Sequence, residues 1–157
     1  MREQRRGKAI AMAAEEIEAY LAEERTCRVA TVGANGEPHV KPLWFVWVDG
    51  ALWLNSVVKS QRWTDVIRSP KVAIVIDGGH DFMELHGVEI IGTAEVIGDA
   101  PRTELAPEGD PARPAEDAFG KKYAGGQFMP DGRHAWLRVV PEKLTSWDFR
   151  KINTIGA

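Results

Sequence analysis

The sequence has a single cysteine, Cys27, among its 157 residues. One thiol cannot form an internal disulfide, so a disulfide framework is excluded and a reducing compartment is favoured. Long apolar runs are also absent, because the apolar residues 9–14 are followed directly by Glu15 and Glu16. That run is too short for a signal peptide or a membrane span. We therefore expect a cytoplasmic protein with no membrane partner.

An excess of basic residues is lacking too. The net charge of −3 provides no global positive field, so a nucleic-acid partner is not expected. The four histidines show no HExxH or similar spacing, so we expect no metal site. No GxSxG, GxGxxG or P-loop motif occurs, which excludes a Rossmann nucleotide site.

The remaining composition is ordinary for a globular protein, with 44% hydrophobic and 27% charged residues. A chain of this length fits one domain. Four of the first eight side chains are basic, and we expect residues 1–10 to form a flexible tail. Residues 11–157 are expected to form a single cofactor-binding domain.

Hydrophobic periodicity predicts short strands with a few helices. The expected helices cover residues 13–25, 60–69 and 115–123. The expected strands cover residues 26–32, 40–48, 51–57, 72–76, 84–97, 135–140 and 143–147, with tight turns at 34–37 and 49–50. Gly87 and Gly92 are expected bulge or bend points, and Pro141 is expected to separate the last two strands. Hairpins in place of crossover helices exclude an open parallel sheet and predict a mainly β fold, a closed antiparallel barrel of six to seven strands with capping helices.

The second expected strand, residues 40–48, is apolar on both faces. Its two faces carry Val40, Trp44, Val46 and Val48 on one side and Leu43, Phe45 and Trp47 on the other. A strand with one solvated face would alternate with polar residues. We therefore expect one face to line the barrel and the other to meet a partner subunit or a ligand.

The sharpest local feature is the run of residues 55–62, where a strand ends at a polar pair and a helix begins. Backbone N–H groups at a helix start are unpaired and carry partial positive charge. With Lys59, Arg62 and two serine hydroxyls added, this start is a good phosphate cradle. The alternative is a solvated helix start with Ser60 as its N-cap.

Two further residues stand out. Lys41 lies in the apolar second strand before Pro42, where it either reaches an edge or serves an anionic ligand. Trp147 lies among polar and charged residues near the C-terminus. It is either a cofactor contact or an aromatic anchor that packs on the barrel.

Several short motifs occur in a fixed order along residues 15–152. They are RVATV at 28–32, NGEP at 35–38, PLWF at 42–45, LNS at 54–56, KSQR at 59–62, SPKV at 69–72, LHGVEIIG at 85–92 and SWDFRK at 146–151. This ordered set resembles the pyridoxamine-5′-phosphate-oxidase-like split β-barrels. KSQR and SWDFRK are most similar to the actinobacterial flavin/deazaflavin oxidoreductases of group B, many of which use coenzyme F420.

The resemblance implies a homodimer with two cofactor sites at the subunit interface. It implies that one group of residues holds the cofactor phosphate, that residues 41–44 run beside the ring, and that Trp147 and Arg150 reach in from the partner. The cofactor-binding residues expected on these grounds are Lys41, Pro42, Leu43, Trp44, Asn55, Ser56, Lys59, Ser60, Gln61, Arg62, Trp147 and Arg150.

The sequence departs from true pyridoxamine phosphate oxidases at three places. Gln61-Arg62 stands where those enzymes usually have Arg-Lys, and His86-Gly87 stands where they have Arg-Gln. Their C-terminal Arg and His pattern does not follow Trp147. These departures argue against vitamin B6 oxidation and weaken the case for FMN.

Three functions therefore compete. The first is an F420-dependent oxidoreductase that transfers hydride between the deazaflavin and an unsaturated small-molecule substrate, with the cofactor carrying the chemistry. The second is an FMN-dependent oxidase or reductase on the same barrel. The third is a protein that binds a cofactor or haem without turnover. No residue stands out in the sequence as a proton donor.

Overall fold

The computed structural model describes residues 1–154. In this part of the chain, six antiparallel strands close into a barrel in the order β1-β2-β3-β6-β5-β4. The strands are β1 (Thr26–Val32), β2 (Pro38–Val48), β3 (Ala51–Val57), β4 (Lys71–Gly78), β5 (His86–Ile97) and β6 (His134–Asp148). The mainly β barrel predicted from the hairpin pattern is confirmed.

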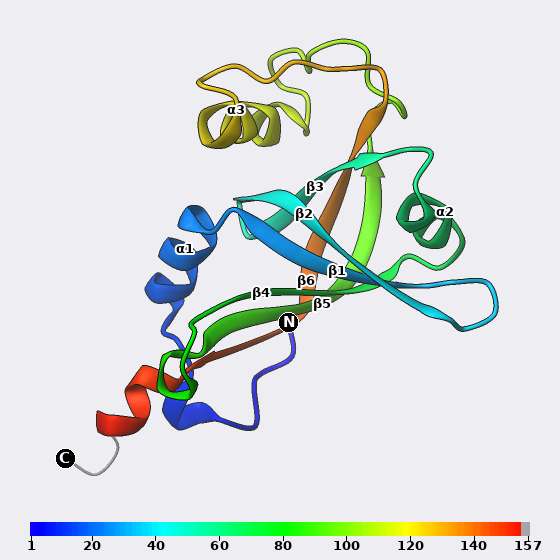
Figure 1. Ribbon diagram of the computed structural model, residues 1–157. Helices are drawn as coiled ribbons and strands as arrows, with labels where there is room; N and C mark the ends of the chain where they lie inside the picture. The colour runs from blue at the N-terminus through cyan, green and yellow to red at the C-terminus, as the bar shows by residue number, and fades with distance from the viewer. Residues whose placement is uncertain (155–157) are drawn as a thin grey trace.

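Three α-helices surround the barrel at different places (Figure 1). They are α1 (Ala14–Glu23), α2 (Gln61–Arg68) and α3 (Arg113–Tyr123), and the short 3₁₀ segments are η1 (Lys8–Ile10), η2 (Phe82–Glu84) and η3 (Phe149–Thr154). In the view of Figure 1, α1 and α2 lie on opposite sides of the barrel and α3 lies above it. No helix in the described residues is long and apolar enough to span a bilayer.

Each predicted helix forms close to its expected place. α2 begins after Ser60, whose hydroxyl accepts a hydrogen bond from the Trp63 N–H at 3.1 Å. This is the N-cap that a serine before an amphipathic run predicts. α3 begins two residues earlier than expected, at Arg113, because Pro114 occupies its first turn, where a missing N–H costs nothing.

The prediction that Pro141 separates two strands is wrong. β6 is continuous from His134 to Asp148, and its pairing with β5 shifts register between Ile91 and Gly92. Gly92 pairs with Pro141 and Ile91 pairs with Lys143, so Glu142 is the extra residue of a β-bulge. Pro141 has no N–H to donate to β5, and the bulge at this point lets β6 continue past it. The bend expected at Gly92 is confirmed by the same shift.

The barrel interior and the space under α3 form two separate cores. Phe45, with Leu43 and Trp47 beside it, packs into the barrel core, while Val46 and Val48 pack into a second cluster beneath α3. Both faces of β2 are thus covered along residues 45–48. The β2 residues nearer its start are different, because Val40 is 62% exposed and Trp44 is 49% exposed.

The N-terminal residues lie along β6. The Arg2 N–H donates to the Glu142 carbonyl at 2.7 Å, and the Gln4 side chain hydrogen-bonds the backbone of Ser146. The flexibility expected of residues 1–10 stays a prediction.

Candidate functional site

The barrel opens where β2 and β3 diverge. The two strands pair only from Phe45 opposite Leu54 to Val48 opposite Ala51. Residues 38–44 of β2 pair with β1 instead, and residues 55–57 of β3 pair with β6. This leaves an opening in the wall between the start of β2 and the end of β3, and two cavities lie along it.

We call the first cavity the polar pocket. It has a volume of about 280 Å³ and is lined by Val29, Thr31, His39, Val40, Lys41, Ser60, Gln61 and Arg62. Its ionisable side chains are a lysine, an arginine and a histidine, and no carboxylate lines it. The pocket is therefore suited to an anion.

Arg62 is the most constrained cation of the polar pocket. Its Nε–H donates to the Ser56 hydroxyl at 3.1 Å, and Ser56 is fully buried. No residue in the described chain hydrogen-bonds its terminal Nη atoms. Burial lowers the pKa of Arg62, but a guanidinium keeps its charge in any case. Arg62 is thus anchored at one nitrogen, with its other donors left for a ligand.

A buried carboxylate supports the pocket from behind. Asp65 is 1% exposed and accepts hydrogen bonds from Thr31 Oγ1 at 2.7 Å, His39 Nδ1 at 2.7 Å and Gln61 Nε2 at 2.8 Å. The histidine nitrogen must be the donor, because an ionised carboxylate only accepts. Asp65 therefore fixes the orientation of His39 and Gln61 in the pocket wall.

These hydrogen bonds keep Asp65 ionised. The bond from Gln61, followed by those from His39 and Thr31, lowers the pKa of Asp65 to about 2 against the opposing effect of burial. The pKa of Asp65 in the folded protein lies below its usual value of 3.8, so ionised Asp65 stabilises the fold. This stabilisation is fully present above pH 3.8 and is lost as the pH falls towards 2.

Replacing Asp65 with asparagine should remove the contribution of Asp65 to the pH dependence of the free energy of unfolding. Urea unfolding of the wild type and of Asp65→Asn should give a constant stability difference above about pH 4 that narrows between pH 4 and pH 2. Other carboxylates titrate in both proteins and cancel in the comparison. Stability curves that stay parallel down to pH 2 would contradict the assigned network.

We call the second cavity the aromatic pocket. It has a volume of about 350 Å³ and is lined by Leu43, Trp44, Asn55, Phe119, Phe128, Met129, Asp131 and His134. The Trp44 ring stacks on Tyr123 of α3, with ring centroids 4.4 Å apart and planes 8° apart. Tyr123 is itself held in place, because its hydroxyl oxygen lies 2.7 Å from the carbonyl oxygens of both Arg25 and Phe45 and donates its one proton between them. The wall that Trp44 presents is therefore rigid.

The two pockets share the strand that separates them. Lys41 lines the polar pocket, whereas Leu43 and Trp44 line the aromatic pocket, two to three residues further along β2. A strand rises about 3.3 Å per residue, so the two sets lie roughly 7–10 Å apart along it. An anionic group in the polar pocket would therefore lie close to a flat group in the aromatic pocket.

Most of the residues predicted from the sequence gather at these two pockets. Lys41, Ser60, Gln61 and Arg62 line the polar pocket, and Leu43, Trp44 and Asn55 line the aromatic pocket. Pro42 is exposed on β2 between them.

Two members of the predicted phosphate group lie elsewhere. Ser56 is covered by Arg62, and Lys59 is exposed without lining either pocket. The hydroxyl of Ser60 is engaged as the N-cap, as in the alternative drawn from the sequence, although the residue still lines the polar pocket.

Trp147 and Arg150 do not join the pockets within one chain. They lie at the end of β6 and in η3, on the side of the barrel opposite α2 (Figure 1). Trp147 packs over Gly87, where an added Cβ would come within 2.6 Å of the indole ring. The Arg150 guanidinium is paired with both oxygens of Asp148, at 2.8 and 3.0 Å.

The sequence analysis missed several lining residues. His39 could have been found from β-strand periodicity, because it lies two residues before Lys41 on the same face of β2. Asp65 lies four residues after Gln61, which is the spacing of side-chain partners on a helix. Phe119 and Asp131 come from the long segment between β5 and β6, and His134 is the first residue of β6. No local pattern ties these residues to Trp44.

The Cys27 thiol and a larger cavity lie outside this site. Burial raises the pKa of the Cys27 thiol to about 12, so it is protonated at neutral pH and is a poor nucleophile. A larger cavity, about 710 Å³, lies between residues 2–6 and the strands β5 and β6, and it contains none of the predicted residues.

Comparison with known proteins agrees with the fold. The family described as pyridoxamine 5′-phosphate oxidase matches residues 13–148. A crystal structure of a conserved hypothetical protein from Mycobacterium tuberculosis is similar, with a TM-score of 0.78 and 27% identity over 97% of this chain and 93% of that one. No curated protein matches.

Two more distant structures share the fold alone. One is an F420 reductase, with a TM-score of 0.60 and 21% identity over 81% of this chain and 94% of that one. The other is HutZ, the heme storage protein from Vibrio cholerae, with a TM-score of 0.62 and 17% identity over 83% of this chain and 92% of that one.

Proposed function

The chain belongs to the pyridoxamine 5′-phosphate oxidase family, and from this premise we propose that it is an F420-dependent oxidoreductase. The observation that carries the proposal is the polar pocket, in which Lys41, His39 and Arg62 face a cavity that no carboxylate lines. F420 joins a flat deazaflavin ring to a phosphate-bearing tail, and the similarity of KSQR and SWDFRK to the F420-using group favours it over FMN.

The residues present fit a phosphate group. The first two N–H groups of α2, those of Gln61 and Arg62, have no acceptor within the helix, because the first four N–H groups of any helix lack one. They add partial positive charge beside the free Nη atoms of Arg62 and the ammonium of Lys41. A phosphate in the polar pocket would satisfy donors that are otherwise left unpaired.

When bound, the cofactor supplies two-electron hydride chemistry, and the protein contributes binding and orientation. Arg62 and Lys41 would hold the phosphate end, and Asp65 would keep His39 in the same pocket wall. Residues 41–44 of β2 would lie beside the ring, with Trp44 held in place by its stack on Tyr123. The apolar side chains of Trp44, Phe119 and Phe128 would shield part of the ring from water.

The second subunit of a homodimer completes the site in this proposal. The end of β6 and η3, which carry Trp147 and Arg150, lie on the side of the barrel opposite α2 (Figure 1), so these residues would approach the pockets from a second copy. Exposed Val40 and Trp44 beside the opening provide apolar surface for such a contact. We place the dimer in the cytoplasm, acting on an unsaturated small-molecule substrate.

An FMN-dependent oxidase or reductase is the second candidate. FMN carries a phosphate too, as a terminal monoester, so the polar pocket that supports F420 supports it as well. Binding of haem without turnover is the third. Both histidines that line the pockets already have their Nδ1 atoms engaged, by Asp65 and Asp131, which leaves only Nε2 as an axial ligand.

Titration of the cofactor-free protein with F420, FMN and haem, side by side, separates these candidates. We expect F420 to bind with a Kd in the micromolar range or tighter, measured by quenching of tryptophan fluorescence. Tight binding of FMN without binding of F420 would overturn the F420 assignment in favour of the second candidate. A Soret band on haem titration, with no F420 or FMN binding, would favour the third.

A further inference from the structure

The aromatic pocket contains a pair of ionisable groups that the proposed phosphate grip does not use. His134 begins β6, and Asp131 lies three residues earlier. The Nδ1 atom of His134 lies 2.6 Å from Asp131 Oδ2, and both residues line the pocket. The only other polar side chain in the pocket wall is that of Asn55.

Asp131 is held in place by the backbone. Its Oδ1 atom accepts the N–H groups of Arg133 and His134, at 2.8 and 3.0 Å. Burial acts to raise its pKa, but these two hydrogen bonds and the one from the imidazole outweigh it and keep the pKa of Asp131 below its usual value. An ionised carboxylate accepts only, so Nδ1 carries a proton in both charge states of the ring, and Nε2 is the nitrogen that gains the second proton of the imidazolium.

The geometry of the pair resembles the orienting half of a catalytic triad, in which a carboxylate fixes one imidazole nitrogen and the other transfers a proton. No described residue hydrogen-bonds Nε2 of His134. The imidazole is about one third exposed, so it is reachable from the cavity.

The rest of the pocket suits a flat ligand. Trp44, Phe119, Phe128 and Met129 supply aromatic and polarisable surface around the histidine. The Arg25 guanidinium lies behind the Trp44–Tyr123 stack, 5.7 Å from the Trp44 ring centroid and 4.7 Å from that of Tyr123. A planar conjugated molecule with one oxygen directed at Nε2 would match both features.

We propose that the aromatic pocket binds the electron acceptor, a flat conjugated carbonyl compound, and that His134 donates the proton that completes its reduction. This inference rests on the proposed function, which supplies the reduced deazaflavin as hydride donor. The acceptor gains one hydride at the carbon β to its carbonyl, and the carbon–carbon π electrons move to the carbonyl oxygen. The Nε2–H bond of the His134 imidazolium breaks, its proton goes to that oxygen to give the enol, and solvent returns a proton to Nε2 of the neutral imidazole. Asp131 is a positioning residue, because it acts through His134.

Few charged groups surround His134. Asp131 faces it from the preceding loop, and the neighbouring Arg133 is exposed. The residues that face it from β2, β3 and α3 are Leu43, Trp44, Asn55 and Phe119, none of which titrates near neutral pH. The limb of a pH profile on which activity falls as the pH rises, where a proton donor loses its proton, should therefore reflect this one imidazole and its carboxylate partner.

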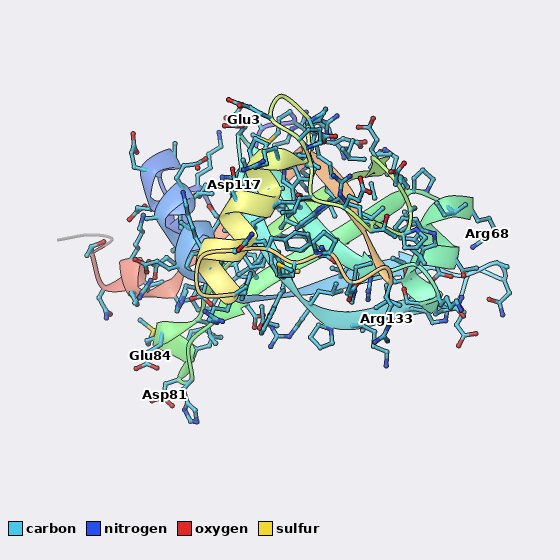
Figure 2. The ribbon with its side chains drawn as sticks, turned by 90° about the horizontal axis from the view of Figure 1, so that it is seen from above. Glu3, Arg68, Asp81, Glu84, Asp117 and Arg133 are labelled. Atoms are coloured by element: carbon cyan, nitrogen blue, oxygen red, sulfur yellow. The ribbon has the colours of Figure 1, made fainter. Side chains whose placement is uncertain are left out.

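The test compares His134→Gln and Asp131→Asn with the wild type. Glutamine at position 134 keeps an N–H donor near the place of Nε2 but cannot give up a proton as an acid. Asparagine at position 131 keeps the Oδ1 acceptor for the N–H groups of Arg133 and His134. The matched control is His80→Gln, since His80 forms a similar pair with Asp81, at 3.2 Å, but is almost fully exposed. Figure 2 shows Asp81 well away from Arg133, the residue next to His134.

Menadione serves as the acceptor probe. In the F420-loaded protein we expect His134→Gln to lower kcat about 100-fold or more and to flatten its pH profile, with the Kd for F420 unchanged. Asp131→Asn should lower kcat to a smaller extent, and His80→Gln should leave it unchanged. A kcat for His134→Gln within about twofold of the wild type would overturn the assignment of the proton donor.

A second readout needs no cofactor. Adding menadione to the cofactor-free protein should shift the His134 Cε1–H signal in the NMR spectrum and leave that of His80 in place. An unchanged His134 signal at saturating menadione would overturn the acceptor site, whatever the outcome with F420. Failure of F420 to bind would instead overturn the proposed function, so the two failures can be told apart.

Discussion

Replacing Arg62 with alanine is expected to weaken cofactor binding about 10- to 150-fold. Hydrogen bonds to charged groups contribute roughly 1.5–3 kcal/mol, which corresponds to this range of affinity. Arg62 is half-buried at the start of α2 and has its Nη atoms free, so the variant removes donors aimed at the pocket. Fluorescence titration of the variant with F420 and FMN measures the change.

Arg68→Ala is the matched control. Arg68 lies in the last turn of the same helix, is exposed and donates only to the carbonyl of Val32 among the described residues. Figure 2 shows its side chain at the outer edge of the molecule. This variant should keep the wild-type Kd. If Arg62→Ala folds normally and binds the cofactor as tightly as Arg68→Ala does, the polar pocket does not hold the phosphate.

Replacing Glu116 with leucine is expected to lower the free energy of unfolding by about 3–5 kcal/mol. Glu116 is 1% exposed, and its Oε1 lies 2.7 Å from Nε of Arg102, which is itself almost fully buried. The contact is an ion pair without hydrogen-bond alignment at that nitrogen. Removing one partner of a buried pair leaves an uncompensated charge, which accounts for a loss of this size.

Glu116 also accepts two further hydrogen bonds that join α3 to the barrel. Its Oε2 accepts the Ala106 N–H at 2.7 Å, and its Oε1 accepts the Trp136 indole N–H at 3.2 Å. Phe119 and Phe128 of the aromatic pocket pack on Trp136. The leucine variant should therefore bind menadione more weakly than the wild type does.

The control for this prediction is Glu95→Ala, which removes an exposed ion pair with Arg138. Exposed pairs contribute about 0–1 kcal/mol, so its unfolding curve should stay close to that of the wild type. A double variant, Arg102→Met with Glu116→Leu, should recover part of the loss, because it removes the unpaired charge. A loss below about 1 kcal/mol for Glu116→Leu alone would contradict the assigned role of the ion pair.

The fold could be predicted from the sequence because its signals are local. Asp49 and Gly50 both adopt positive φ at the β2–β3 turn, as the hairpin signal predicts. The helix start at Ser60 follows from the N-cap rule. Pro141 misled the prediction, because a β-bulge depends on the pairing partner and not on the strand's own residues.

The polar pocket was partly predictable for the same reason. Ser60, Gln61 and Arg62 are consecutive, and Lys41 is an anomaly in an apolar strand. The role of Asp65 was not predictable, because its partners Thr31 and His39 come from two other strands. The aromatic pocket required α3 to fold back over β2, a long-range contact that no sequence spacing encodes. The predicted contribution of Trp147 and Arg150 from a second subunit stays a prediction.

A crystal structure of the protein grown with F420 tests the central claim most directly. We predict phosphate density in the polar pocket, within hydrogen-bond distance of the Arg62 Nη atoms and the first N–H groups of α2, with the Lys41 ammonium beside it. Phosphate density at any other position, with Arg62 still bonded only to Ser56, would contradict the account.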